Sequence, residues 1–371
     1  MPSVQIPPIK DHSSTAVNNQ STWPKAILHL DMDAFFVNVH ILAHPEDAGI
    51  PLAVGGHPGS RGVIASASYE ARKFGVRSAL PSSRALRLCP QLKIVGHTWS
   101  GIQEYSQQVM DILAEYGPVE KMSVDEAYVD LTGVPQPEDL AQTIRRRVKK
   151  ETGLPASVGL ATSKLVAKVS SDFDKPEGCT IVRPGDEEKF LAPQSVRVIM
   201  GIGPRTAERL AELKITTCGE LARADLELLR QSMGNQAEHL QRRALGKDSR
   251  SVRTERGQVK SISQERTFSE DVNDPQELAN QILVMAASVS KSLQKRNLVA
   301  HTIRVKFRWA DFTTFTRQRS VIVGIDDEDR ISQIALAIWS ANWSKEDKLR
   351  LLGVGVAGLE ELSVRQFDFG F

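Results

Sequence analysis

The sequence predicts an α+β protein of several domains, and three observations support this fold class. With 371 residues the chain is too long for one ordinary hydrophobic core, so about two to four domains are expected. Its first half reads as strand, helix, hairpin, helix and strand, in that order. Its second half holds helical segments at 187–245, followed at 302–309 by a strand in which apolar and cationic residues alternate.

The composition is that of a globular protein, with 41% hydrophobic and 25% charged residues. Cys89, Cys179 and Cys218 are far apart, so neither a disulfide framework nor a cysteine zinc site is expected, which fits a reducing cytoplasm. The longest apolar runs are shorter than the roughly 18 residues of a membrane span. The polar residues 1–24 lack a signal-peptide core, and we expect a mobile extension there and no membrane association.

Two acidic runs suggest a metal site. A strand at 26–30 delivers Asp31 to its carboxyl end, and the pair Asp125 and Glu126 lies inside the strand-forming run 122–130. Since successive side chains of a strand point to opposite faces, both acids reach one site only at a hairpin tip or bulge. Carboxylate oxygens are ligands that Mg²⁺ prefers. Either run alone is weak evidence, because Asp-Glu pairs at turns are usually solvated surface.

Further motifs accompany these acids along the chain. They are Tyr69-Glu70-Ala71-Arg72, Lys164, Lys168 and Gly201-Ile202-Gly203. Together with the acidic runs, their order and spacing resemble the Y-family DNA polymerases, and within them the DinB-type bacterial branch. The resemblance extends from about Ala26 to the C-terminus.

This resemblance implies the architecture of a right-hand polymerase: a ferredoxin-like palm, small fingers, a helical thumb with a helix-hairpin-helix, and an αβ little-finger domain. It also implies where each part lies. The N-terminal extension takes residues 1–24, the palm 25–34 and 97–171, the fingers 35–96, the thumb 172–246, a linker 247–258, the little finger 259–365 and a tail 366–371.

The resemblance implies the catalytic residues as well. Asp31, Asp125 and Glu126 would be catalytic and would hold two Mg²⁺ ions, with the carbonyl oxygen of Met32 as a further metal ligand. Asp33 is left open as a metal ligand, since an acidic side chain at this place can instead orient its neighbours.

Five residues would contact the incoming nucleotide: Phe36, Ser66, Tyr69, Arg72 and Lys164. Phe36 would be the steric gate, an aromatic ring that leaves no room for a 2′-hydroxyl group. Arginine offers a fork of donors that matches phosphate oxygens, and tyrosine adds a hydroxyl donor. Two alternatives stay open, since Phe35-Phe36 can be core aromatics and the run at 69–72 an ordinary amphipathic helix. Relatives usually carry Asn where this chain has Ser163, which weakens the assignment of Lys164.

DNA would be bound at two places. Gly201 and Gly203 would let backbone N–H groups approach a phosphate beside a helix N-terminus, although such turns are also common packing elements. In the strand at 302–309, one face is apolar and the other carries Arg304, Lys306 and Arg308. Residues 291–319 contain eight Lys or Arg against one acid, a basic stripe able to follow phosphates.

The partners expected are primer-template DNA, deoxynucleoside triphosphates and a sliding clamp. The clamp expectation rests on residues Gln366 to Phe371, which resemble clamp-binding peptides of bacterial polymerases and can equally be a frayed terminus. We expect a monomer located in the cytoplasm.

The function expected is template-directed DNA synthesis by two-metal phosphoryl transfer, with low fidelity across damaged bases and without proofreading. Two alternatives compete with this function. A catalytically inactive Y-family-like DNA-binding scaffold of a mutagenesis complex would have lost the metal ligands, which are present here. Nucleotide cyclases also pair acids on a palm-like fold, but they need neither a helix-hairpin-helix nor a basic C-terminal sheet.

Overall fold

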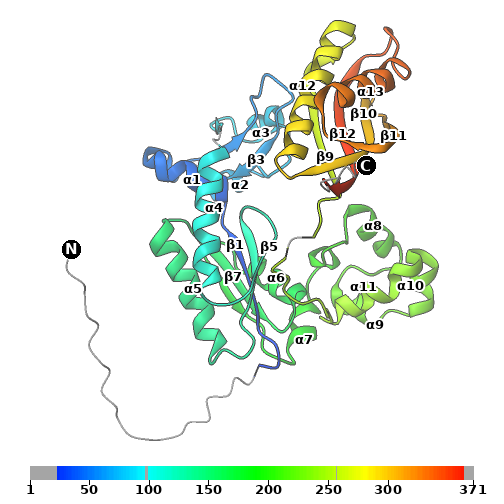
Figure 1. The fold of residues 1–371 in the computed structure, drawn as a ribbon. Coiled ribbons are helices and arrows are strands. Elements are labelled where there is room, and N and C mark those ends of the chain that lie inside the picture. Colours follow the sequence, from blue (N-terminus) through cyan, green and yellow to red (C-terminus); the bar gives the residue numbers. More distant parts are fainter. Residues whose placement is uncertain (1–22, 97–98, 256, 363–371) are drawn as a thin grey trace, which may run out of the picture. The chain divides into compact units, whose positions relative to one another are not determined.

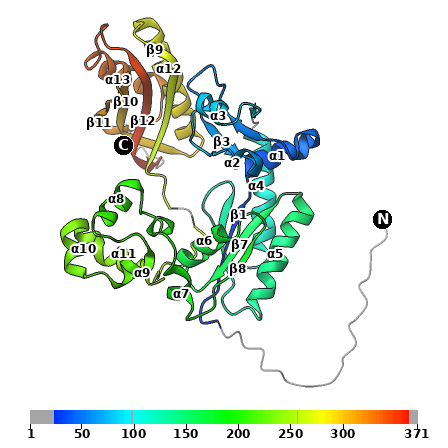
Figure 2. The same cartoon turned by 180° about the vertical axis from the view of Figure 1, so that it is seen from behind.

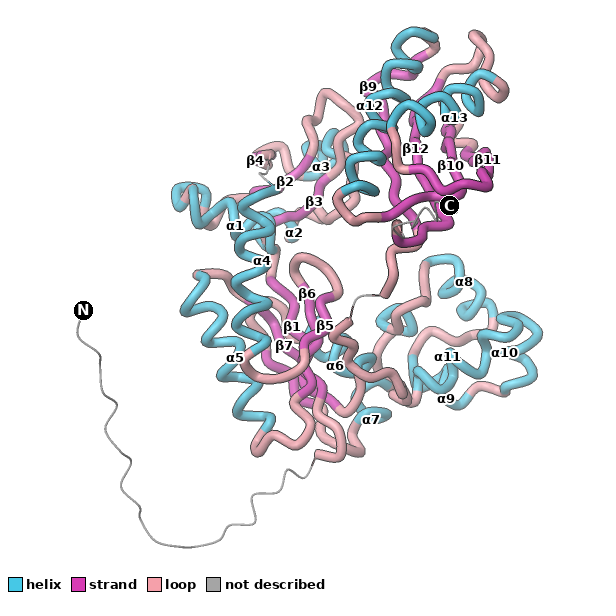
Figure 3. Tube along the Cα trace, in the orientation of Figure 1, coloured by secondary structure: helices cyan, strands magenta, loops and turns pink. Residues whose placement is uncertain are grey.

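The computed structural model describes residues 23–96, 99–255 and 257–362 (Figure 1). The described residues form two compact units, one comprising 23–52 and 99–255 and the other 53–96 and 257–362. Each contains both helices and strands, so the predicted mixture of α and β structure is confirmed (Figure 3). None of the described helices is long and apolar enough to cross a membrane.

A five-stranded sheet in the order β5-β6-β1-β7-β8 is the centre of the first unit. Its middle strand, β1, runs antiparallel to β6 and β7, while β7 and β8 are parallel. The strands are β1 (Ile27–Met32), β5 (Val119–Lys121), β6 (Glu126–Asp130), β7 (Ala156–Ala161) and β8 (Cys179–Ile181). The hairpin that the sequence predicts around the second acidic run is thus β5 and β6, joined by residues 122–125.

Helices cover both faces of this sheet, as Figures 1 and 2 show. Leu28 and Leu30 of β1 pack into a core with α4 (Trp99–Ala114) and α5 (Pro137–Thr152). Ile27 and, on β6, Tyr128 pack on the opposite face with α6 (Lys164–Phe173). Residues 27–30 are consequently fully buried, as expected of a central strand covered on both sides.

The core beneath α6 continues into a group of short helices. Pro204 and Gly203 begin the longest of them, α8, with proline at the first turn, where its missing N–H group costs no hydrogen bond. The group comprises α7 (Glu187–Leu191), η2 (Val196–Val198), α8 (Pro204–Glu212), α9 (Cys218–Arg223), α10 (Leu226–Met233), η3 (Gly234–Gln236) and α11 (Ala237–Ala244). The helical segment predicted at 187–245 is therefore confirmed. Along the chain, β1 is followed within the first unit by α1 (Phe35–Ala43) and η1 (Pro45–Asp47).

The second unit contains two sheets. A three-stranded sheet has the order β3-β2-β4, with β2 (Leu52–Gly55), β3 (Ile64–Ala67), β4 (Lys93–Val95) and the helices α2 (Tyr69–Arg72) and α3 (Ser82–Leu88). A four-stranded antiparallel sheet has the order β11-β10-β12-β9, with β9 (Ser261–Val272), β10 (Leu298–Trp309), β11 (Thr314–Ile325) and β12 (Leu349–Glu361). Helices α12 (Pro275–Gln294) and α13 (Glu328–Ser340) pack on one face of the latter sheet.

The alternation predicted for residues 302–309 is visible in β10. Ile303, Val305 and Phe307 are fully buried against α12 and α13. Arg304, Lys306 and Arg308 alternate with them and therefore lie on the other face of the sheet.

Close packing of α6 on β7 depends on Gly159. A β-carbon at this position would overlap the carbonyl oxygen of Ala167 and the hydroxyl group of Ser170, both on α6. We predict that Gly159→Ala lowers the free energy of unfolding by about 1–3 kcal/mol, because overpacking a filled core displaces its neighbours. Urea unfolding followed by circular dichroism measures this. Gly96→Ala, at an exposed glycine with no heavy atom within 4 Å of the added carbon, is the control; equal stability of the two variants would contradict the prediction.

Candidate active site

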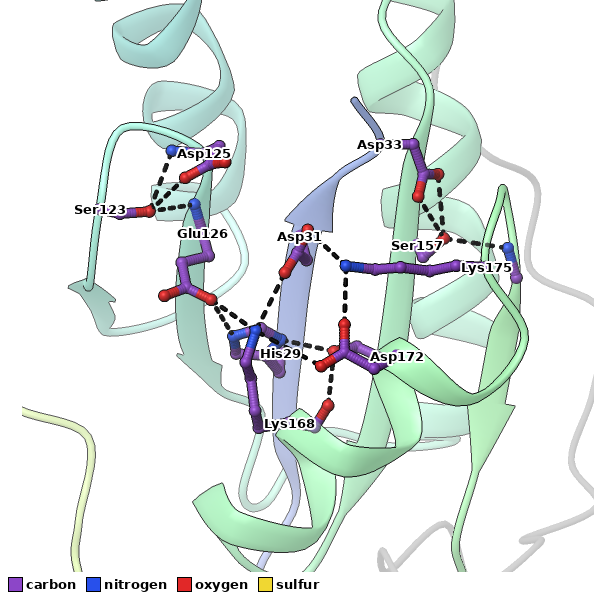
Figure 4. A network of polar contacts seen from close by, with 12 residues as sticks. His29, Asp31, Asp33, Ser123, Asp125, Glu126, Ser157, Lys168, Asp172 and Lys175 are labelled. Carbon is purple, nitrogen blue, oxygen red and sulfur yellow. Dashed lines mark hydrogen bonds and ion pairs between the residues drawn. The ribbon is translucent and has the colours of Figure 1, made fainter. Parts of the chain in front are cut away.

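Two carboxylates from neighbouring strands face each other at one end of the five-stranded sheet. In the antiparallel register Asp31 of β1 lies directly opposite Glu126 of β6, and directly opposed residues point to the same face. Helix α6 covers this face and brings Lys168 to the pair (Figure 4). Lys168 Nζ lies 3.0 Å from Asp31 Oδ2 and 2.7 Å from Glu126 Oε2, so one ammonium group joins the two strands.

A second lysine binds the other oxygen of Asp31. Lys175 Nζ lies 2.6 Å from Asp31 Oδ1 and 2.7 Å from Oδ1 of Asp172 (Figure 4). Burial works to raise the pKa of Asp31, but the charges of Lys175 and Lys168 outweigh it and hold that pKa below its ordinary value. Asp31 is therefore ionised at neutral pH and kept so by two cations.

His29 lies two residues before Asp31 on the same face of β1 and is fully buried. Its Nδ1 is 2.7 Å from the hydroxyl group of Ser171, and its ring packs against that of Tyr128 at a centroid distance of 4.6 Å. Burial holds the pKa of His29 below its ordinary value, so the ring is neutral at pH 7. Its Nε2 faces Glu126 Oε2 at 3.5 Å. His29 and Lys168, against the effect of burial, lower the pKa of Glu126 to about 2.

Asp125 lies in the turn before β6. The Ser123 hydroxyl group is 2.5 Å from Asp125 Oδ1 and accepts hydrogen bonds from the N–H groups of Asp125 and Glu126. The main-chain oxygen of Asp125 accepts the N–H of Met32 at 2.9 Å, which fastens the turn to the end of β1. Burial, assisted by the negative charges of Asp31 and Glu126, raises the pKa of Asp125. The third carboxylate is thus close enough to interact with the other two.

Lys164, which is expected at the nucleotide, is buried at the start of α6, one helical turn before Lys168. Its ammonium group is 2.6 Å from Glu120 and 4.7 Å from the ring centroid of Tyr128. Ser163 caps α6 by accepting the N–H of Val166. The lysines that contact Asp31 are instead Lys168, which the sequence analysis noted without a role, and Lys175, which it missed.

The donor atoms are of the type that Mg²⁺ prefers, but in this arrangement lysines hold the carboxylates. No three acidic, His or Cys side chains among the residues that the structure describes are arranged to bind a metal directly. Both oxygens of Asp31 contact ammonium groups, and Asp125 bonds to Ser123. Even so, oxygens of Asp31 and Glu126 converge on a single positive charge, with Asp125 beside them and Met32 at the end of the same strand. Oxygen ligands around one cation are the chemistry of a magnesium site.

The residues expected at the nucleotide lie in both units. Phe36 is on α1 of the first unit, with its ring 5.9 Å from those of Phe35 and Trp99. In the second unit, Arg72 lies over the ring of Tyr69 at 4.4 Å and donates to the carbonyl oxygen of Ala67. Ser66, on β3, is buried.

The glycines expected at DNA lie in the exposed turn before α8. Gly201 has a φ of +99°, a conformation that favours glycine, and Gly203 is the N-cap of α8. Arg243 donates to the carbonyl oxygen of Met200 at 2.6 Å and holds this turn.

The basic stripe predicted at 291–319 is divided by the sheet. On the face away from the helices, Arg304 bonds at 3.0 Å to Gln318 of the neighbouring strand β11. Lys306 reaches across Gly353 of β12 and lies 2.8 Å from Glu265 of β9. Arg317 and Arg319 lie opposite Val305 and Ile303 in the register, and hence project on the face that the helices cover. The prediction of one continuous stripe is therefore wrong, because alternation in β11 sends these two arginines to the other side.

Comparison with known proteins identifies relatives over most of the chain. The impB/mucB/samB family matches at residues 30–172, and the C-terminal domain of the same family at 259–369. A DNA polymerase IV of Halorhodospira halophila is 40% identical over 344 residues, covering 91% of this chain and 96% of the relative. A DNA polymerase IV of Bacillus anthracis is 37% identical over 352 residues, covering 93% and 85%.

Solved structures give the same result. A Y-family DNA polymerase chimera of Dbh and Dpo4 superposes with a TM-score of 0.82 at 26% identity, covering 91% of this chain and 99% of the chimera. DinB from Sulfolobus solfataricus gives a TM-score of 0.61 at 26% identity, with 90% and 98% covered.

The bridge made by Lys168 predicts how stability depends on pH. Glu126 has a pKa of about 2 in the folded chain against an ordinary value of 4.5, so its stabilisation is present above pH 4.5 and is lost as the pH falls toward 2. Lys168→Met leaves two carboxylates less well paired and should lower the apparent free energy of unfolding at pH 7 by about 1–3 kcal/mol. This difference should shrink below pH 4.5.

Urea unfolding without divalent ions, from pH 7 to pH 2, measures the effect. Lys150→Met removes an exposed lysine of α5 and serves as the control. A Lys168→Met deficit that is the same at every pH would contradict the prediction.

Proposed function

The chain belongs to the Y-family DNA polymerases, in their DNA polymerase IV branch, and we propose that it extends primers by two-metal phosphoryl transfer at Asp31, Asp125 and Glu126. Enzymes of this branch are DNA-directed DNA polymerases that act in translesion synthesis, and this chain is one of them. A single observation supports the site: carboxylates of Asp31 and Glu126, from adjacent strands, converge on one cation with Asp125 beside them.

The side chains have distinct roles in this proposal. Asp31, Asp125 and Glu126, with the carbonyl oxygen of Met32, would hold two Mg²⁺ ions. Ions bound there would lower the pKa of the primer 3′-hydroxyl group. They would also stabilise the negative charge that develops during in-line displacement. The protein contributes mainly position and electrostatics, as is usual for phosphoryl transfer.

Positive side chains would neutralise the triphosphate. Arg72 and Tyr69 keep the role expected from the sequence, with Ser66 on the neighbouring strand and the ring of Phe36 as the steric gate. Lys164 also keeps that role in the proposal, but its side chain is only 5% exposed and is therefore less accessible to a phosphate. Lys175, which is in contact with Asp31 and only partly buried, is the better candidate for a charge beside the phosphates.

DNA would be bound through the backbone at Gly201 and Gly203 and through Arg304, Lys306 and Arg308. The proposed sliding-clamp contact, at residues Gln366 to Phe371, lies outside the described residues. Low fidelity and the lack of proofreading belong to the same proposal, as the resemblance to the Y-family polymerases implies. A monomer in the cytoplasm remains our expectation.

Primer extension by the purified protein tests the proposal. We predict that the wild type adds deoxynucleotides to a primer in a template- and Mg²⁺-dependent manner, and that Asp31→Asn and Glu126→Gln each lower kcat/KM by at least about 100-fold, as loss of transition-state charge stabilisation does elsewhere. Glu104→Gln, at an exposed glutamate of α4, is the control. A wild-type protein that binds primer-template DNA but never extends it would support the inactive scaffold instead.

Sugar selection tests the role of Phe36. We predict that Phe36→Ala raises the ratio of ribonucleotide to deoxynucleotide incorporation by about tenfold or more, because the pocket gains room for a 2′-hydroxyl group. Single-nucleotide insertion kinetics with both sugars measure it. Leu42→Ala, on the same helix, should leave the ratio unchanged. An unaltered ratio in Phe36→Ala would remove the gate assignment.

A further inference from the structure

We propose that Asp33 is a positioning residue for the reaction: with Ser157 and helix α5, it fixes the turn at residues 175–178 and thereby holds the Lys175 ammonium group against Asp31. Sequence alone offers Asp33 as one more acid beside a metal ligand. The structure turns it away from the other carboxylates and toward this turn. The inference rests on the proposed function only for what Lys175 does once a nucleotide is bound.

The carboxylate of Asp33 is buried, with 1% of the residue exposed, and it bonds to both the turn and the strand beneath it. Ser157 Oγ on β7 lies 3.0 and 2.9 Å from its two oxygens, and the N–H of Glu177 donates to Oδ2 at 2.8 Å (Figure 4). A buried carboxylate is costly unless such bonds are made. Its position therefore depends on the turn, and the turn's position depends on it.

Gly178, the last residue of the turn, is bonded to strand β7. The N–H of Gly178 donates to Ser157 Oγ at 3.3 Å, and its carbonyl oxygen accepts the N–H of Val158 at 3.0 Å. A β-carbon at Gly178 would overlap the carbonyl oxygen of Asp174, so only glycine permits this approach. Ser157 thus connects Asp33 to the N–H of Gly178, while the next residue of β7, Val158, holds the carbonyl oxygen of the same glycine.

Helix α5 holds the turn from the opposite side. Arg145 Nη1 donates to the carbonyl oxygen of Glu177 at 2.6 Å, and Lys149 Nζ is 2.5 Å from the Glu177 carboxylate. Glu177 has a φ of +56°, in the left-handed region that residues other than glycine seldom adopt. Such a conformation persists where its surroundings fix it, and here the N–H, the carbonyl oxygen and the side chain of Glu177 are each bonded.

Fixing this turn also fixes the backbone of Lys175, two residues before Glu177. Its side chain is 20% exposed and its ammonium group lies between Asp31 and Asp172. A lysine ammonium group is strongly hydrated and sits on a flexible stem, so a lysine keeps one position only where its backbone is fixed. Fixing the turn makes Lys175 a defined charge at the carboxylates.

Steady-state kinetics distinguish positioning from a general effect on folding. Asp33→Asn and Ser157→Ala should lower kcat/KM for the nucleotide by about tenfold or more, within the loss that misplacement of a catalytic group by about 1 Å can cause. The Kd for primer-template DNA should not change. In a Lys175→Ala background the same substitutions should have no further effect, since the group they position is gone. Full additivity with Lys175→Ala would overturn the proposal.

Helix α5 offers a matched pair of variants. Arg145→Ala removes the bond to Glu177 and should reduce kcat/KM, whereas Arg146→Ala removes the adjacent arginine, which bonds only to Gln142 of its own helix among the described residues. Equal losses in the two variants would show a general effect of charge on α5 and would contradict the proposed role of Arg145 in fixing the turn at residues 175–178.

Hydrogen exchange supplies a readout that needs no activity. In the wild type the amide hydrogens of Glu177 and Gly178 should be protected, and both Asp33→Asn and Ser157→Ala should make them exchange at least about tenfold faster while the amides of β1 stay protected, as expected of local opening. Unprotected amides in the wild type would refute the proposal that Asp33 and Ser157 fix this turn. If the amides are protected but the wild type extends no primer, the proposed function fails, whereas the fixing of the turn by Asp33 and Ser157 is still supported.

Discussion

The register between β1 and β6 is the constraint on which the rest of the site depends. It sets Asp31 and Glu126 side by side at the end of a fully buried strand, where two like charges repel and each loses hydration. That arrangement is stable only with positive charge between them. Lys168 supplies it because α6 packs closely on β7, and that packing in turn requires the glycine at 159.

The same electrostatic demand explains why parts of the chain distant in sequence meet here. Asp31 needs a second cation, and Lys175 provides it from a turn beyond α6. His29, neutral because it is buried, faces Glu126 without adding charge. The site is therefore built from a strand, a hairpin turn, a helix and a loop, each of which satisfies the polar groups of another.

Much of this could be predicted from the sequence, for identifiable reasons. Alternation predicted the buried and cationic faces of β10 because a strand has a fixed period. The acidic runs marked Asp31, Asp125 and Glu126 only together with the motifs that follow them, whose order and spacing resemble the Y-family polymerases. The choice among lysines could not be predicted. Lys164 and Lys168 are one helical turn apart on the same face of α6, and only the position of the helix along β1 decides which reaches Asp31. The bonds of Asp33 and Glu177 join residues 144 positions apart, beyond any local pattern.

Charge balance then argues for divalent cations at this place. Asp31, Asp125, Glu126 and Asp172 are four carboxylates, and Lys168 and Lys175 are two ammonium groups, so the cluster retains two negative charges when all six are ionised. The excess is felt by Asp125, whose pKa is raised by burial and by the charges of its two neighbours. Ammonium groups can satisfy single oxygens, but only a small ion of higher charge can neutralise several carboxylates from one position. If Asp31 and Glu126 held a divalent cation in place of Lys168, its charge would offset their repulsion, and the Lys168 ammonium group would be free to face an anion such as a triphosphate.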